Sequence, residues 1–245
     1  TTDPVSYRTQ GTYRITWTYT DAAGNFATQT QEVEVKDETA PVFTPVSAIA
    51  KDTDPNTCGA VVTFPLPTVT DNCSASVTIT QTAGLAPGEL YPVGKTTNTF
   101  VATDAAGNTS TISFDVTVTD TQKPSVVTRN ITVQLNGAGQ ATITAAELNG
   151  GIADNCGIRS IVLDKTTFDC TTIGDNVVNL TITDVHGNVS NGFAYVTVED
   201  KTVPVARARN LTVQLNAEGK ATITPAMVDD NSSDTCGEIR LALDK

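Results

Sequence analysis

Histidine, methionine and tryptophan are almost missing from this sequence of 245 residues, which contains one of each. Catalytic zinc sites and hydrolytic triads both depend on histidine. With His186 alone, no Ser-His-Asp set and no metal-binding His pair can be assembled, and the chain has no Gly-rich phosphate loop. The sequence therefore predicts a protein that is not an enzyme.

Basic residues are also scarce, because 15 Lys and Arg stand against 27 Asp and Glu, for a net charge of -12. A chain this acidic repels nucleic acid and anionic membranes, so we expect neither as a partner. No apolar run is long enough to span a bilayer, and we expect no direct membrane insertion in this segment. A soluble surface protein, or one that binds cations, fits this balance.

An internal repeat is present. Asp-Ala-Ala-Gly-Asn at 21–25 recurs at 104–108 and, as Asp-Val-His-Gly-Asn, at 184–188. An Asp-x-x-x-Pro segment follows each copy, at 37–41, 120–124 and 200–204, in the same register. The segment Asn-Ile-Thr-Val-Gln-Leu-Asn at 130–136 also returns, as Asn-Leu-Thr-Val-Gln-Leu-Asn at 210–216. Three markers in one register fix a period of about 80 residues, typical of a sandwich domain.

Proline stops strands, so the Asp-x-x-x-Pro segments are the natural boundaries. Residues 1–36 are predicted to be the C-terminal half of one repeat, and residues 200–245 the N-terminal half of another. Residues 37–119 and 120–199 are then two complete repeats.

Many short β-type segments and turn signals predict an all-β fold of tandem immunoglobulin-like β-sandwich repeats. The clearest strands alternate around Trp17, Phe100 and Leu180, which we expect to be core anchors, and Asp-x-x-Gly-Asn is the turn to the next strand. Paired valines mark that next strand, at 33 and 35, 116 and 118, and 196 and 198. Earlier strands are expected near 60–64, 76–81, 131–135, 141–144 and 158–163, with one helical turn at 145–148.

The five cysteines follow the same period, because Cys73, Cys156 and Cys236 occupy equivalent positions. Short loops favour the disulfides Cys58–Cys73 and Cys156–Cys170, with a partner for Cys236 outside the chain. Disulfides imply an oxidising, extracellular compartment. The rival interpretation, a zinc site, lacks the necessary Cys and His spacing.

Four motifs of the second repeat have a familiar form: Cys-Gly-Ala-Val-Val at 58–62, Asp-Asn-Cys at 71–73, Tyr-Pro-Val-Gly-Lys-Thr at 91–96 and Ala-Thr-Asp-Ala-Ala-Gly-Asn at 102–108. Together they resemble the HYR (hyalin repeat) family, and residues 11–36 resemble its tail. The later repeats are similar to the Leu-Thr-Val-Gln-Leu repeats of very large Bacteroidetes surface proteins, including SprB-like gliding-motility adhesins. The resemblance implies an immunoglobulin-like fold and extracellular adhesion. Full HYR repeats often carry two further cysteines, near Thr44 and Ile112 here, and the loss of both suits a Cys58–Cys73 pair.

Calcium is the candidate ligand. In an immunoglobulin topology the loop between the last two strands lies at the same end as the preceding linker. Carboxylate and amide oxygens should therefore gather there and suit Ca²⁺. The expected ligands are Asp37, Glu38, Asp104 and Asn108 in one set and Asp120, Asp184 and Asn188 in the other. Asp71 and Asp154 rank lower, because a Cys58–Cys73 bridge would draw that segment toward the other end. The alternative is that each Asp only caps a turn.

The leading function is a stalk segment of a large extracellular cell-surface adhesin, serving as spacer and adhesive surface, with neighbouring repeats and an unidentified glycan or protein as partners. A carbohydrate- or protein-binding module would need exposed aromatic residues, for which Tyr7, Phe43, Tyr91 and Tyr195 are the candidates. An accessory stalk of a secreted enzyme is a second alternative. A filament or surface-layer subunit, completed by strand exchange between chains, is a third.

Overall fold

The computed structural model describes residues 6–73 and 76–244. The chain divides into two compact units, residues 1–121 and 122–245, and each is described by itself. None of the helices among the described residues has the length and apolar character needed to cross a membrane.

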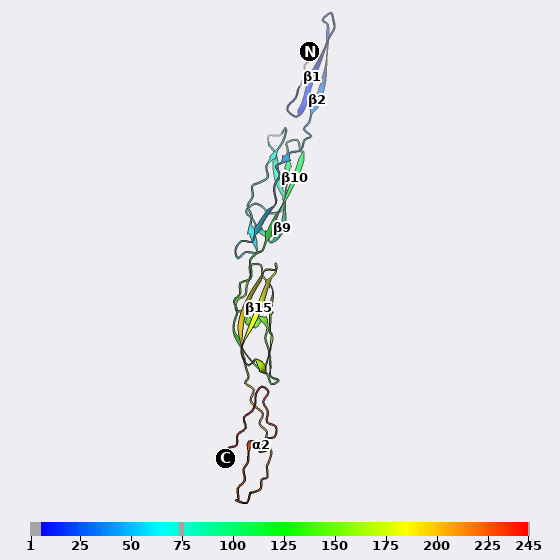
Figure 1. Ribbon diagram of the computed structural model, residues 1–245. Coiled ribbons are helices and arrows are strands. Elements are labelled where there is room, and N and C mark those ends of the chain that lie inside the picture. Colours follow the sequence, from blue (N-terminus) through cyan, green and yellow to red (C-terminus); the bar gives the residue numbers. More distant parts are fainter. Residues whose placement is uncertain (1–5, 74–75, 245) are drawn as a thin grey trace. The chain divides into compact units, whose positions relative to one another are not determined.

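The first unit begins with a hairpin, β1 (Gly11–Thr20) and β2 (Phe26–Val35), whose strands pair antiparallel. A β-sandwich follows (Figure 1). One of its sheets has the order β4-β10-β9-β7, with β4 parallel to β10, and two short ladders, β3-β6 and β5-β8, lie across the core. The strands are β3 (Val42–Phe43), β4 (Ile49–Asp52), β5 (Gly59–Val61), β6 (Val69–Thr70), β7 (Thr78–Ala83), β8 (Leu90–Pro92), β9 (Gly94–Thr103) and β10 (Thr109–Thr119).

The second unit repeats this plan, with a sheet of order β11-β16-β15-β13 and a ladder β12-β14. Its elements are β11 (Ile131–Gln134), β12 (Gln140–Thr142), α1 (Ala145–Leu148), β13 (Ile158–Leu163), β14 (Thr167–Asp169), the 3₁₀ turn η1 (Cys170–Thr172), β15 (Gly174–Asp184), β16 (Val189–Glu199) and α2 (Pro225–Val228). The expected turn at 145–148 is α1, which Thr144 and Glu147 cap reciprocally. The all-β prediction of immunoglobulin-like sandwich repeats is confirmed by this strand pairing.

Alternation along the last two strands builds both cores, because every second side chain points inward. Phe100 is 1% exposed and Leu180 is 0% exposed, as expected of core anchors. The expectation was wrong for Trp17, which is 50% exposed. The hairpin β1-β2 is a two-stranded sheet, and no second sheet packs over Trp17 among the described residues. Its indole N–H instead donates to Gln31 Oε1 at 3.0 Å.

A buried polar network distinguishes the core of the first unit. Asn98 is fully buried, and its Oδ1 accepts hydrogen bonds from Gln81 Nε2 at 3.1 Å, the Leu85 backbone N–H at 3.0 Å and the Tyr91 hydroxyl at 3.1 Å. The loop before β8 is thereby tied to β9, with Gly84 packed directly on the Asn98 amide.

Two glycines of this region offer a matched test of that packing. Gly84 and Gly88 have φ of +89° and +88°, but a Cβ on Gly84 would lie 2.2 Å from Asn98 Oδ1, whereas a Cβ on Gly88 would meet nothing within 4 Å. We expect Gly84→Ala to cost about 1–3 kcal/mol more than Gly88→Ala, because the backbone penalty is shared and only one site is overpacked. Urea denaturation of both variants measures the difference, and equal losses would contradict the described network.

Candidate functional site

The Asp-x-x-Gly-Asn segment forms the same hydrogen-bonded clamp in three copies. In the second copy Asp104 Oδ1 accepts the Asn108 backbone N–H at 2.8 Å, and Asp104 Oδ2 accepts the Asn108 side-chain amide at 2.8 Å. Asp21 with Asn25, and Asp184 with Asn188, make the same pair of bonds. Each Asp therefore shapes its turn, whatever else it does.

The clamp of the second copy lies against the segment that follows β2, as the topology led us to expect. The Asn108 amide donates to the Asp37 carbonyl at 3.1 Å and to the Thr39 carbonyl at 3.3 Å. The Nδ2 of Asn108 is therefore committed to hydrogen bonds with this segment and with its own clamp, which leaves Oδ1 as its one possible ligand atom. Glu38 is exposed to solvent. Neither residue is among the three whose ligand oxygens the structure groups together, and their ligand roles stay predictions.

Asp71, which the sequence ranked lower, joins two of the expected ligands. One carboxylate oxygen from each of Asp37, Asp71 and Asp104 lies within 4.8 Å of the others. Asp37 and Asp104 are 9% and 7% exposed. Asp71 Oδ1 accepts the Cys73 backbone N–H at 3.0 Å, and Asp37 Oδ1 accepts the Thr39 N–H at 3.1 Å. We call these three residues the carboxylate cluster.

In the second unit the corresponding Asp154 and Asp184 also bring carboxylate oxygens within 4.8 Å of each other. Asp154 Oδ1 accepts the backbone N–H groups of Cys156 and Gly157, in the same Asx-type turn that Asp71 makes. Asp184 is fully buried. Asp120, in the first unit, accepts the Thr53 hydroxyl at 3.3 Å, and its approach to Asp184 and Asn188 stays a prediction.

Hydrogen bonding dominates the electrostatics of the clamps. Burial acts to raise the pKa of Asp104, but donors from Asn108, Ala106 and Gly107 outweigh it and hold that pKa below its usual range. The pKa of Asp184 is lowered in the same way by Asn188, His186 and Gly187 against the effect of burial. Both carboxylates are therefore ionised at neutral pH.

The Cys73 thiol lies beside the carboxylate cluster. Burial raises its pKa, and the charges of Asp37, Asp71 and Asp104 raise it further. A thiolate is disfavoured at this position, which argues against a nucleophilic role.

The disulfide pairing corrects the one expected from the sequence. Cys170 bonds to Cys236, 66 positions away, and Cys73 is a free, exposed cysteine. Cys58 and Cys156 are also disulfide-bonded. The predicted pairs Cys58–Cys73 and Cys156–Cys170 were thus wrong, as was an external partner for Cys236.

Strand length gives the physical reason in each repeat. Cys156 is held beside the end of β15, where Ile158 pairs with Asp184, whereas Cys170 precedes the start of β15. The 11 residues of β15 separate these points by more than 30 Å at about 3.3 Å per residue, far beyond the reach of a disulfide. β9 separates Cys58 from Cys73 in the same way, because β8, the partner of β5, leads directly into it.

Gly139 makes room for the bridge that does form. A Cβ at this position would lie 2.7 Å from Cys170 Sγ and 3.2 Å from Cys236 Sγ. In the first unit the equivalent position, at the start of the matching ladder, is Cys58 itself. Both repeats therefore have a cysteine at this end of the ladder, but on different strands. Cys58 precedes β5, the first strand of its ladder, whereas Cys170 follows β14, the second strand of its ladder. Disulfides in this arrangement fit an extracellular environment.

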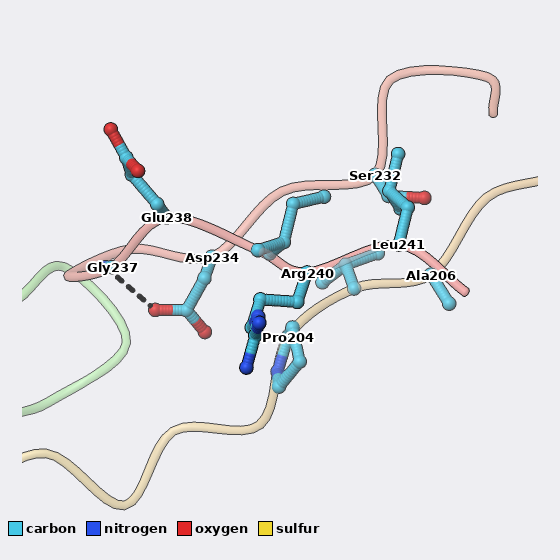
Figure 2. Close-up of a pocket in the computed structure, with 10 residues that line it drawn as sticks. Pro204, Ala206, Ser232, Asp234, Gly237, Glu238, Arg240 and Leu241 are labelled. Atoms are coloured by element: carbon cyan, nitrogen blue, oxygen red, sulfur yellow. Dashed lines mark hydrogen bonds between the residues drawn. The ribbon is translucent and has the colours of Figure 1, made fainter. Parts of the chain in front are cut away.

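No catalytic centre emerges among the described residues. His186 is exposed, and its backbone N–H donates to Asp184. A cavity of about 330 Å³ lies between segments 204–206 and 232–241, where Gly237 N–H bonds to Asp234 (Figure 2). Ala206 corresponds to Val126, which in the preceding repeat packs against Gly192 of β16. The cavity is therefore the open side of a sandwich rather than a built pocket.

Sequence reasoning named Tyr195 as a candidate exposed aromatic residue but missed Phe193, its neighbour on the same face of β16. Phe193 and Tyr195 are 54% and 45% exposed, with ring centroids 5.8 Å apart in an edge-to-face arrangement. Val177, opposite Tyr195, shares this outer face. Of the aromatic residues considered from the sequence, Tyr91 is fully buried and Phe43 packs on the core. The sequence did contain a signal for this face. Phe193 and Tyr195 stand where β10 has the polar residues Ser113 and Asp115, so two aromatic rings occupy positions that point to solvent in the other repeat.

Comparisons with known proteins agree with the repeat pattern. Residues 36–118 match the HYR domain. Hyalin from Lytechinus variegatus is 30% identical over 241 residues, which cover 90% of this chain and 44% of that protein. Hyalin from Strongylocentrotus purpuratus is 28% identical over 98% of this chain and 21% of its own length. The chain therefore spans less than half the length of these relatives, and it contains an HYR-like repeat.

A protocadherin GammaB4 extracellular domain superposes with a TM-score of 0.37 at 19% identity, covering 86% of this chain and 41% of that one. At this level of superposition the fold assignment rests on the strand pairing itself.

Proposed function

We propose that this chain is a stalk segment of a large extracellular cell-surface adhesin, in which each repeat serves as spacer and adhesive surface. The observation that carries the proposal is the reuse of one structural plan. The Asp-x-x-Gly-Asn clamp recurs with the same hydrogen bonds in three copies, so its polar groups hold turns rather than perform chemistry. The HYR match supports an extracellular repeat module.

The partners that follow are the neighbouring repeats of the same chain and a glycan or protein of the surroundings. The Cys170–Cys236 bridge supports a stiff segment, because it ties the ladder end of one predicted repeat to the Asp-Thr-Cys turn of the next. On a gliding bacterium such an array would act as a motility adhesin, in keeping with the resemblance of residues 120–245.

The exposed aromatic pair favours a second candidate, a carbohydrate-binding module within the array. Rings of Phe193 and Tyr195 offer flat apolar faces for stacking, and Asn179, opposite Phe193, offers its side-chain oxygen for hydrogen bonds while its Nδ2 donates to Asp164 at 2.7 Å. Repeat 37–119 lacks this surface, since Ser113 and Asp115 stand at the same positions. Binding would then be a property of repeat 120–199 alone.

One experiment separates the two. In the full-length protein, we expect in-frame deletion of residues 120–199 to leave surface display and adhesion intact and to shorten the reach of the protein from the cell, measured by immunolabelling of unpermeabilised cells and by adhesion under flow. Loss of adhesion on deletion, reproduced by Phe193→Ser with Tyr195→Asp, would instead assign binding to the aromatic face. This double variant is the matched control, because it installs the residues of the other repeat. Absence of the protein from the cell surface would refute the adhesin proposal.

A further inference from the structure

The carboxylate cluster joins three different parts of the first unit. Asp37 belongs to the segment between β2 and β3, Asp71 follows β6, and Asp104 follows β9. Their oxygens lie within 4.8 Å of one another. Three negative charges at this separation repel one another strongly where burial reduces screening by water.

Local hydrogen bonds do not account for the whole cluster. Asp104 is satisfied by its clamp, but Asp37, at 9% exposed, has a buried Oδ2 without a hydrogen-bond partner among the described residues, and the Cys73 thiol beside its carboxylate is only a weak donor. A buried charged acceptor without a partner is expensive. Among the described residues, no ion pair reaches Asp37 or Asp104. A bound cation would offset the negative charge of the cluster and give Asp37 Oδ2 a partner.

We propose that Asp37, Asp71 and Asp104 bind a Ca²⁺ ion that fastens the segment between β2 and β3 to the sandwich that follows. Ca²⁺ binds carboxylate oxygens at about 2.4 Å, so two ligands of one ion lie at most about 4.8 Å apart, as these do. Mg²⁺ demands a near-ideal octahedron and retains most of its water, whereas Ca²⁺ accepts several carboxylates in irregular geometry, so a set of three aspartates favours Ca²⁺. Water and backbone carbonyls would complete the coordination.

The second unit contains an independent copy of two of these groups. Asp154 Oδ2 is buried without a hydrogen-bond partner among the described residues, and its carboxylate lies within 4.8 Å of that of Asp184. An unpaired aspartate oxygen next to a clamp aspartate thus occurs in both units. The inference concerns a ligand of the repeat and does not depend on what the array binds.

The test is a Ca²⁺ titration of the 245-residue chain by isothermal titration calorimetry. Asp37→Asn keeps an oxygen for the Thr39 N–H but removes the charge, so we expect it to reduce the number of bound Ca²⁺ ions by one, or the affinity of that site by about tenfold or more. Asp21→Asn is the matched control, since among the described residues its clamp belongs to no carboxylate cluster, and it should bind like the wild type. Asp71→Asn, which keeps its oxygen for the Cys73 N–H, is a second variant should Asp37→Asn fold poorly.

A thermal melt gives a readout that a purely structural role would not produce. Without Ca²⁺, Asp37→Asn should melt at or above the wild-type temperature, because repulsion is relieved. With millimolar Ca²⁺ it should melt below the wild type, because a ligand of the native state is lost. The proposal is overturned if Ca²⁺ does not bind, if Mg²⁺ raises the wild-type melting temperature equally, or if Asp37→Asn binds Ca²⁺ as the wild type does. None of these outcomes bears on surface display or adhesion, so the proposed function is tested separately.

Discussion

Replacing both Cys170 and Cys236 by Ser is expected to lower the free energy of unfolding of the second unit by about 4 kcal/mol. The bridge closes a loop of 66 positions, and a cross-link of that span removes this much chain entropy from the unfolded state. Residues 200–245 should lose the most, since their regular structure is confined to α2 and isolated bridges such as Val205 with Ser233. Hydrogen exchange resolved along the chain measures the loss.

Cys73→Ser is the control for this change, because Cys73 is exposed and carries no disulfide. It should shift stability by no more than about 0.5 kcal/mol, as surface substitutions usually do. Peptide mapping without reduction should recover Cys170 linked to Cys236 and Cys73 unlinked. Recovery of Cys156 linked to Cys170 would refute the Cys170–Cys236 disulfide and support the short-loop pairing that the sequence predicted.

Truncating the core anchors is expected to have effects that differ sharply among the three copies. Phe100→Ala should cost about 3–5 kcal/mol and Leu180→Ala about 2–5 kcal/mol, because each leaves a cavity in a closed core. Trp17→Ala should cost less than about 1 kcal/mol, because half of this side chain is already in water. Denaturant titrations followed by circular dichroism measure all three losses. Tryptophan fluorescence would not serve, because Trp17→Ala removes the one tryptophan of the chain.

The three variants test the packing of the hairpin directly. A loss for Trp17→Ala as large as that for Phe100→Ala would mean that another sheet covers β1 and β2 in the folded protein. The exposed Tyr19, on the same face as Trp17, would then be covered with it.

Local chemistry alone was enough to predict much of this structure. The spacing of Asp21, Asp104 and Asp184 predicted the period and the hairpin turns, because an Asp-x-x-Gly-Asn clamp is closed within five residues. Alternation around Phe100 and Leu180 predicted their strands and burial, because a strand places every second side chain on one face. These features are set by neighbours in the sequence, so the fold class could be read without coordinates.

Tertiary structure decided everything that depends on which end of a strand a residue occupies. Cys156 and Cys170 are close in sequence, yet the length of β15 holds them apart and leaves Cys170 to Cys236. Asp71 lies at the same end as Asp37 and Asp104, although the sequence ranked it below Glu38 and Asn108. A loop length records the distance along the chain, whereas disulfides and ligand sets require distance through space. Which residues are close through space is decided only when the strands have paired into the sandwich.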